Sequence, residues 1–124
     1  KIKDFKDLIV WQESHKLVLD IYKITKTFPK EELFGLVSQM RRCSVSITSN
    51  IAEGFGRQGY KEKLRFFYIA HGSLIELKNQ LEICKDIGYM ENNVYKKLIE
   101  KADLSHKLLR GFITKTKTFL IPNS

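Results

Sequence analysis

Asp103 and His106 stand three residues apart, the spacing of the carboxylate and imidazole ligands in di-iron helical bundles. Such a centre needs this pair on two helices and a further carboxylate on each of the other two. The chain holds one copy of the pair, so we expect no metal site and no cofactor. His15 and His71 are isolated in the sequence; we expect the first in a helix core and the second in a close helix contact.

Asn50 and Glu53 are three residues apart on one face of an expected helix, and Arg57 is placed for an i,i+4 ion pair with Glu53. Two interpretations stay open: Glu53 is a catalytic acid or metal ligand, or the two side chains form a polar cluster that fixes helix packing. We favour the second. The glycine-rich stretch 54–59 has the wrong spacing for a phosphate-binding loop and follows a helix. We therefore expect no catalytic residue and a non-enzymatic protein.

Four amphipathic segments would position these residues, at about 7–27, 31–58, 60–87 and 92–119. Pro29, Gly59 and Gly88 fall at the breaks between the segments, and Pro122 follows the last of them. Because the breaks are short, successive helices must run in opposite directions. We therefore predict one all-α domain over residues 1–124, an antiparallel up-down-up-down four-helix bundle.

Each segment repeats apolar or small residues at alternating steps of three and four, which is typical of a helix face packed on a core. The expected core faces are Leu8, Trp11, His15, Val18, Tyr22 and Thr25; Leu33, Val37, Met40, Ser44, Ile47, Ile51 and Gly54; Phe67, Ala70, Leu74, Leu77, Leu81 and Cys84; and Tyr95, Leu98, Ala102, Ser105, Leu109, Phe112, Thr116 and Phe119. A second apolar set lies outside these faces and indicates subunit contacts in a homo-oligomer. It comprises Leu19, Ile21, Val45, Phe66, Tyr68, Ile69, Ile75, Ile83, Leu104, Leu108 and Ile113.

Residues 39–54 combine small and hydroxyl side chains without a proline, which favours close packing of this helix against a neighbour. Reflection about Gly59 places Ser44 level with Ser73. The expected packing motif consists of Ser44, Asn50, Glu53, Gly54, Gly72 and Ser73. Cys43 and Cys84 would then lie too far apart for a disulfide, and we expect both to be reduced and buried.

Hydrophobic residues make up 43% and charged residues 29% of the chain, as in ordinary globular domains. No apolar run approaches the roughly 20 residues that a membrane span needs. The first residues lack the apolar stretch of a signal peptide, so we expect a cytoplasmic location. A formal net charge of +8 allows an anionic partner without requiring one.

Five short motifs follow one another along nearly the whole chain. They are Phe5…Leu8-Ile9-Val10-Trp11-Gln12, Phe28-Pro29…Glu32…Gly35-Leu36, Gln39-Met40-Arg41-Arg42, Ser49-Asn50-Ile51-Ala52-Glu53-Gly54 and Ala70-His71-Gly72-Ser73-Leu74…Glu76-Leu77. Together they resemble the 23S rRNA intervening-sequence proteins, bacterial four-helix bundles that include the accessory variability determinant of diversity-generating retroelements. The resemblance implies a homopentameric barrel, nucleic-acid binding in some members, a reverse transcriptase as partner of the retroelement members, and no catalytic residues.

The expected topology concentrates positive charge at one end of the bundle. Residues 1–13, 53–65 and 106–124 meet there and carry eleven Lys and Arg against five acids, a net charge of +6, whereas residues 20–32 and 82–103 have a net charge of −1. Phosphate backbones bind such surfaces by releasing counterions. We therefore expect RNA or DNA at this end, with phosphate contacts from Arg57, Lys61, Lys63, Arg65, Arg110, Lys115 and Lys117.

Other interpretations of these side chains stay open. Lys115 and Lys117 would also offset the dipole of the last helix. Tyr60, Phe66 and Tyr68 would either stack on bases or make core and subunit contacts. From a different class of function, the protein would be a scaffold that docks a partner protein such as a reverse transcriptase. A metalloenzyme is the weakest alternative.

Overall fold

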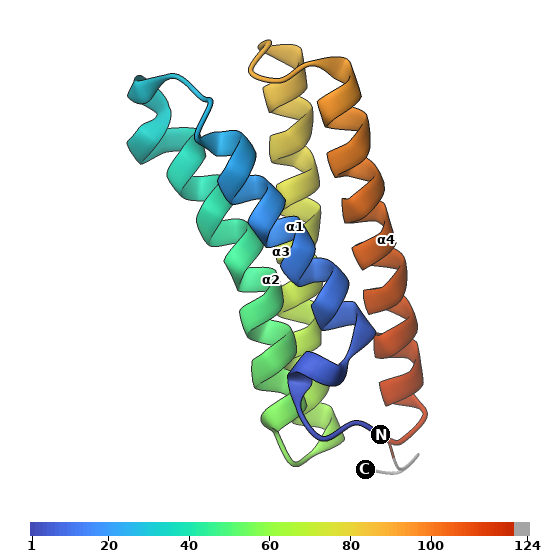
Figure 1. Cartoon of the computed structure of the whole chain (residues 1–124). Coiled ribbons are helices and arrows are strands. Elements are labelled where there is room, and N and C mark those ends of the chain that lie inside the picture. The colour runs from blue at the N-terminus through green and yellow to red at the C-terminus, as the bar shows by residue number, and fades with distance from the viewer. Residues whose placement is uncertain (121–124) are drawn as a thin grey trace.

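The computed structural model describes residues 1–120 and contains four long helices (Figure 1). They are α1 Ile9–Thr25, α2 Ser38–Gly56, α3 Tyr60–Asp86 and α4 Asn92–Lys117. The prediction of an all-α four-helix bundle is confirmed. The predicted stop at Pro122 lies outside the described residues.

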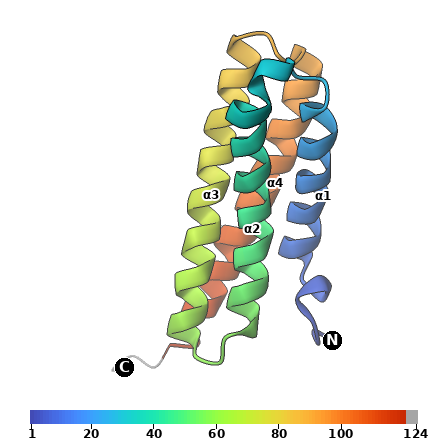
Figure 2. The same ribbon diagram turned by 90° about the vertical axis from the view of Figure 1, so that its left-hand side faces the viewer.

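Contacts between the helices fix which elements are neighbours. α2 packs along α3, α3 along α4, and α1 lies against both α2 and α4 (Figure 2). Cys43 Sγ donates to the Ser73 carbonyl at 2.9 Å, whereas Lys63 reaches the end of α2 at the Phe55 carbonyl. The early part of α2 therefore meets the middle of α3, and the end of α2 meets the start of α3, as the reflection about Gly59 requires.

The start of the second helix differs from the prediction. Residues 30–37 form a 3-10 turn, Lys30–Glu32, and a π-helical turn, Leu33–Val37, before α2 begins at Ser38. Gly35 has φ −109° and ψ −111°, which is not a helical conformation, so a continuous α-helix from residue 31 is interrupted there. A further 3-10 turn, Phe5–Asp7, precedes α1 and is capped by Asp4.

The end of α3 agrees with the prediction. Gly88 has φ +84°, the left-handed conformation that ends a helix with little strain only at glycine. The Tyr89 amide donates to the Cys84 carbonyl at 2.9 Å across this turn. Gly88 therefore ends α3 and begins the connection to α4.

The predicted core face of α1 is confirmed at Leu8, Val18 and Thr25, whereas at its other three positions the preceding residue is buried instead. Its buried residues are Val10, Ser14, Leu17, Val18, Ile21 and Thr25. Trp11 and His15 are only half-buried and stack on each other at 4.6 Å, and Tyr22 is 39% exposed. Because the turn at Phe5–Asp7 supplies an aromatic partner, with Phe5 edge-on to Trp11 at 5.2 Å, the indole packs on the flank of the core.

The other predicted core faces are confirmed for most of their length. Leu33 and Phe119 are each 51% exposed and are the exceptions at the helix ends. Ile21 and Ile113, predicted outside the core, are buried. The residues of that second set that are exposed are Leu19, Val45, Tyr68, Ile69, Ile75, Ile83 and Leu104. None of the helices in residues 1–120 is long and apolar enough to cross a bilayer.

The close approach of α2 and α3 occurs at one of the two predicted glycines. A Cβ atom on Gly54 would lie 2.5 Å from the Phe67 ring and 3.1 Å from the Lys63 carbonyl oxygen. Gly72, in contrast, is exposed, and a Cβ atom there would meet nothing within 4 Å. The assignment of Gly72 to the packing motif is therefore wrong, because it lies on the outer face of α3.

The hydroxyl residues of the motif form a smaller network than expected. Ser44 is fully buried and donates to the Arg41 carbonyl at 3.0 Å. Ser46 and Ser73 share a hydrogen bond of 2.8 Å between α2 and α3, and Asn50 donates to the Ser46 carbonyl at 2.8 Å. Glu53 is exposed, so the predicted polar cluster of Asn50 with Glu53 does not form.

Both cysteines are free and buried, as predicted. Burial raises the pKa of the Cys43 thiol to about 12 and that of the Cys84 thiol to about 11. Both therefore remain protonated at neutral pH and act as small core residues.

Candidate nucleic-acid interface

Three segments that are distant in the sequence meet at one end of the bundle. The chain start, the turn between α2 and α3, and the end of α4 lie together at the bottom of Figure 1. Tyr60 stacks on Phe119 with ring centres 5.1 Å apart, which joins the turn to α4. Phe5 and Arg57 line one hollow, which joins the chain start to the same turn. The expected grouping of basic segments is thus present.

Two arginines of this end share one aromatic ring. The guanidinium carbons of Arg57 and Arg65 lie 4.5 and 4.9 Å from the centre of the Phe66 ring. Cation–π contacts of this kind hold a guanidinium in place while its N–H groups remain exposed. Lys61, one turn earlier on α3, is also exposed. The turn therefore presents three cations, two of them oriented by Phe66.

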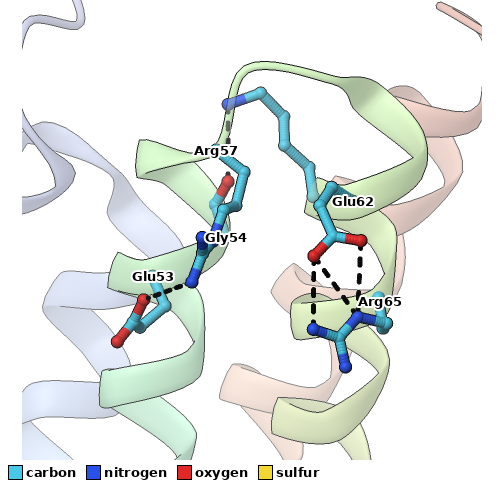
Figure 3. Close-up of polar contacts among 6 residues, drawn as sticks. Glu53, Gly54, Arg57, Glu62 and Arg65 are labelled. Carbon is cyan, nitrogen blue, oxygen red and sulfur yellow. Dashed lines mark hydrogen bonds and ion pairs between the residues drawn. The ribbon is translucent and has the colours of Figure 1, made fainter.

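Each of these arginines has an acidic neighbour. Figure 3 shows the Arg57–Glu53 pair on one side of the turn and the Arg65–Glu62 pair on the other, both with N···O distances of 3.2 Å. The arginine side chains are 45% and 61% exposed. Exposed pairs of this kind contribute about 0–1 kcal/mol, so a phosphate oxygen can replace either carboxylate at small cost.

Lys63 has a structural role instead of the predicted phosphate contact. Its ammonium donates to the carbonyl of Phe55 at 2.7 Å and to that of Gly54 at 3.4 Å. These carbonyls belong to the last turn of α2, where the Gly54 carbonyl also accepts from the Arg57 amide at 3.2 Å. Burial lowers the pKa of Lys63, in keeping with its enclosed position. We remove Lys63 from the candidate phosphate contacts.

The basic residues of α4 lie on two sides of that helix. Lys117 lies over the Tyr68 ring at 5.5 Å, and Arg110 lines the same hollow between α3 and α4. Lys115 instead borders a hollow with Ile9 on the side of α1. The predicted set therefore divides into a turn cluster (Arg57, Lys61, Arg65), an α3–α4 pair (Arg110, Lys117) and the separate Lys115.

A chain of polar contacts between α3 and α4 was missed at the sequence level. Asp103 Oδ1 and His106 Nδ1 each lie 2.8 Å from the Lys78 ammonium, and His106 Nε2 lies 2.9 Å from His71 Nε2. His71 and His106, expected to be isolated, are thus hydrogen-bonded to each other. Aligning α3 and α4 in opposite directions would have placed His71 near His106. The same alignment brings Tyr95 to Glu82, to which its hydroxyl group donates.

The hydrogen-bond donors among Lys78, His106 and His71 follow from the protons that each group carries. An ammonium has no lone pair, so Lys78 donates to Nδ1 of His106. Nε2 of His106 then carries the proton and donates to Nε2 of His71. Burial lowers the pKa of His106, and the charges of Lys78, His71 and Arg110 lower it further against the opposing effect of Asp103.

This geometry predicts acid sensitivity at His106. Because its pKa is lower in the folded chain than the usual value of 6.5, the unfolded chain binds more protons as the pH falls below that value. The wild type should therefore lose more unfolding free energy than His106→Gln between about pH 7.5 and pH 5.5. Urea unfolding at several pH values measures this. Parallel pH profiles of the two proteins would contradict it.

Within residues 1–120, no group of three or more His, Cys, Asp or Glu side chains is placed to hold a metal ion. The Asp103–His106 pair faces Lys78, whose positive charge disfavours a cation at that position.

Comparisons with known proteins agree with the fold. The chain is similar to a solved structure from Bacteroides thetaiotaomicron, of a protein with unknown function from the S23 ribosomal protein family. The TM-score is 0.80 at 24% identity, and the match covers 88% of this chain and 98% of that chain. No curated protein matches the chain. The family model of the 23S rRNA-intervening sequence protein matches residues 6–111. The chain therefore belongs to the 23S rRNA-intervening sequence protein family.

Proposed function

We propose that this protein is a cytoplasmic, non-enzymatic homo-oligomer whose basic end binds the phosphate backbone of RNA or DNA. The observation that carries the proposal is the turn cluster, in which Arg57 and Arg65 share Phe66 beside the exposed Lys61. Preoriented guanidinium groups suit phosphate because they donate two hydrogen bonds at once. Arg110 and Lys117 add two cations on the α3–α4 side.

Assembly into a ring, pentameric in keeping with the family resemblance, would repeat this basic end around one axis. The exposed side chains of Ile69, Ile75 and Ile83 along the outer face of α3 support a subunit contact. A ring with parallel bundle axes presents the turn clusters as a positive annulus. Sequence-independent binding follows, because the proposed contacts reach phosphates and not base edges.

Salt dependence tests the proposal directly. Five phosphate contacts on single-stranded RNA predict a slope of about −3.5 in a plot of log affinity against log salt concentration. Affinity should then fall about a hundredfold between 50 and 200 mM KCl. Fluorescence anisotropy of a labelled RNA oligonucleotide measures this slope. Absence of binding at 50 mM KCl, or affinity that is independent of salt, would contradict the proposal.

A second candidate function is a scaffold that docks a partner protein. A reverse transcriptase is one such partner, because the family that the sequence resembles includes the accessory determinant of diversity-generating retroelements. Phe34 favours the scaffold, because this side chain is 93% exposed beside the half-exposed Leu33. Both belong to the turn Leu33–Val37, which leads into α2 at the end of the bundle opposite the connection between α2 and α3 (Figure 1). An apolar contact of this kind resists moderate salt. A complex that survives 300 mM KCl and is lost in Phe34→Ser would support the scaffold over the nucleic-acid interface.

A further inference from the structure

A second basic site lies on the flank of the bundle, away from the turn cluster. A hollow of about 370 Å³ opens between α3 and α4 beside the His71–His106 contact. Its polar and charged lining residues are Lys78, Asp103, His106, Lys107, Arg110 and Thr114. Three of the six side chains are cationic and one is anionic.

The charges of this hollow sum to +2 while His106 is neutral. Asp103 is already paired with Lys78 at 2.8 Å. Among residues 1–120, neither Lys107 nor Arg110 forms an ion pair with a carboxylate. The hollow therefore presents two cations without a carboxylate partner, next to a third that is paired with Asp103.

One of these cations, Lys78, is also held in position. The Lys78 ammonium has three N–H donors, of which Asp103 and His106 occupy two, so one remains to be directed at a ligand. Arg110 supplies a planar set of N–H donors, and Thr114 adds a hydroxyl group to the same wall. This combination of three cations and a hydroxyl group suits a tetrahedral oxyanion of charge −2.

We propose that this hollow binds the dianionic phosphate group of a small phosphomonoester, held by Lys78, Lys107, Arg110 and Thr114, with His106 taking up a proton as the anion binds. The proposal does not rest on nucleic-acid binding at the turn cluster. It concerns a terminal phosphate, which carries one more negative charge than the phosphodiester of a nucleic-acid backbone.

The proton uptake follows from the groups around His106. From α3 it faces His71 and Lys78, and from α4 it faces Asp103, Lys107 and Arg110. In the empty site, burial and then the charges of Lys78, His71 and Arg110 lower the pKa of the imidazole. A bound dianion offsets their charge, so the imidazole gains a proton at Nδ1 and a further attraction to the ligand. The Lys78 N–H group that Nδ1 accepts in the empty site then turns to the anion. Dianion affinity should therefore rise as the pH falls from 8 to 6.

Sulfate is the probe that isolates this effect, since it stays dianionic over the whole range. Isothermal titration of the full chain with sulfate, at constant ionic strength, should show saturable binding that is about tenfold tighter at pH 6 than at pH 8. Arg110→Gln should weaken it about tenfold, as expected for the loss of a charge-assisted contact. Lys96→Gln, at the other end of α4, is the matched control and should bind like the wild type.

Each outcome decides one part of the proposal. No saturable binding at pH 6, or equal affinity in Arg110→Gln, would overturn the site. An unchanged pH dependence in His106→Gln would overturn the proton uptake. Methyl phosphate should bind more tightly than dimethyl phosphate; equal affinities would overturn the phosphomonoester and make the hollow a contact for nucleic-acid backbone. None of these results depends on whether RNA binds at the turn cluster, so the two proposals fail separately.

Discussion

Gly54→Ala should lower the free energy of unfolding by about 1–3 kcal/mol, the usual cost of overpacking a core. The added Cβ atom would lie 2.5 Å from the Phe67 ring and 3.1 Å from the backbone oxygen of Lys63. Phe67 is 1% exposed and packs on Phe112 with ring centres 4.9 Å apart, so its ring has little room to move. The better helix propensity of alanine offsets only part of this cost.

Gly72→Ala provides the matched control for this prediction. Gly72 is also inside a helix, but it is exposed and a Cβ atom there meets nothing within 4 Å. This substitution should stabilise the protein by about 0.5–1 kcal/mol through helix propensity alone. Urea unfolding followed by circular dichroism measures both variants. If Gly54→Ala matches Gly72→Ala, the close contact of α2 with Phe67 is refuted.

Reversing the three charges of the turn cluster should weaken RNA binding at low salt by about a hundredfold or more, because each reversal removes an attraction and adds a repulsion. The variant carries Arg57→Glu, Lys61→Glu and Arg65→Glu. Lys63 is left intact because it caps α2 through the Phe55 and Gly54 carbonyls. The loss of two exposed ion pairs should change stability by less than about 1 kcal/mol each.

The control has the same change in net charge at the other end of the bundle. Lys23, Lys26 and Lys30 are exposed there, and their reversal to glutamate should weaken RNA binding far less. Size-exclusion chromatography should give the same elution volume for both variants and the wild type. Equal loss of RNA affinity in the two variants would mean that overall charge, and not the turn cluster, binds the nucleic acid.

Sequence periodicity was sufficient where a helix is long and has one buried face. All six residues of the predicted core face of α3 are buried, from Phe67 to Cys84. The conformation of Gly88 and the register of α2 against α3 also followed from the sequence, because few residues other than glycine adopt positive φ and short connections fix the register.

Periodicity failed where a turn outside the helix, or a non-helical residue within it, decides which side chains are buried and where the helix begins. Trp11 packs on Phe5, a residue of a turn that the helical pattern does not show, and Val10 is buried in place of Trp11. The non-helical backbone at Gly35 delays the start of α2. Gly54 and Gly72 look alike in the sequence. They differ in the structure because Gly54 faces the Phe67 ring, whereas nothing lies within 4 Å of a Cβ atom on Gly72.

The sequence predicted which end of the bundle is basic, but not which of its basic side chains are free to bind phosphate. Net charge by segment located the basic end, but it could not show that the Lys63 ammonium is used by the end of α2. It also could not show that Arg57 and Arg65 share Phe66. The Lys78–His106–His71 chain joins residues up to 35 positions apart, so it becomes visible only when α3 and α4 are aligned.

The salt dependence of RNA affinity, compared between the wild type and the turn-cluster variant, tests the central claim most directly. Loss of three phosphate contacts should reduce the slope of log affinity against log salt concentration by about 2, from about −3.5 to about −1.5. Anisotropy titrations over 50–200 mM KCl measure both slopes under identical conditions. The same slope in both proteins would contradict the proposal that Arg57, Lys61 and Arg65 contact the phosphate backbone.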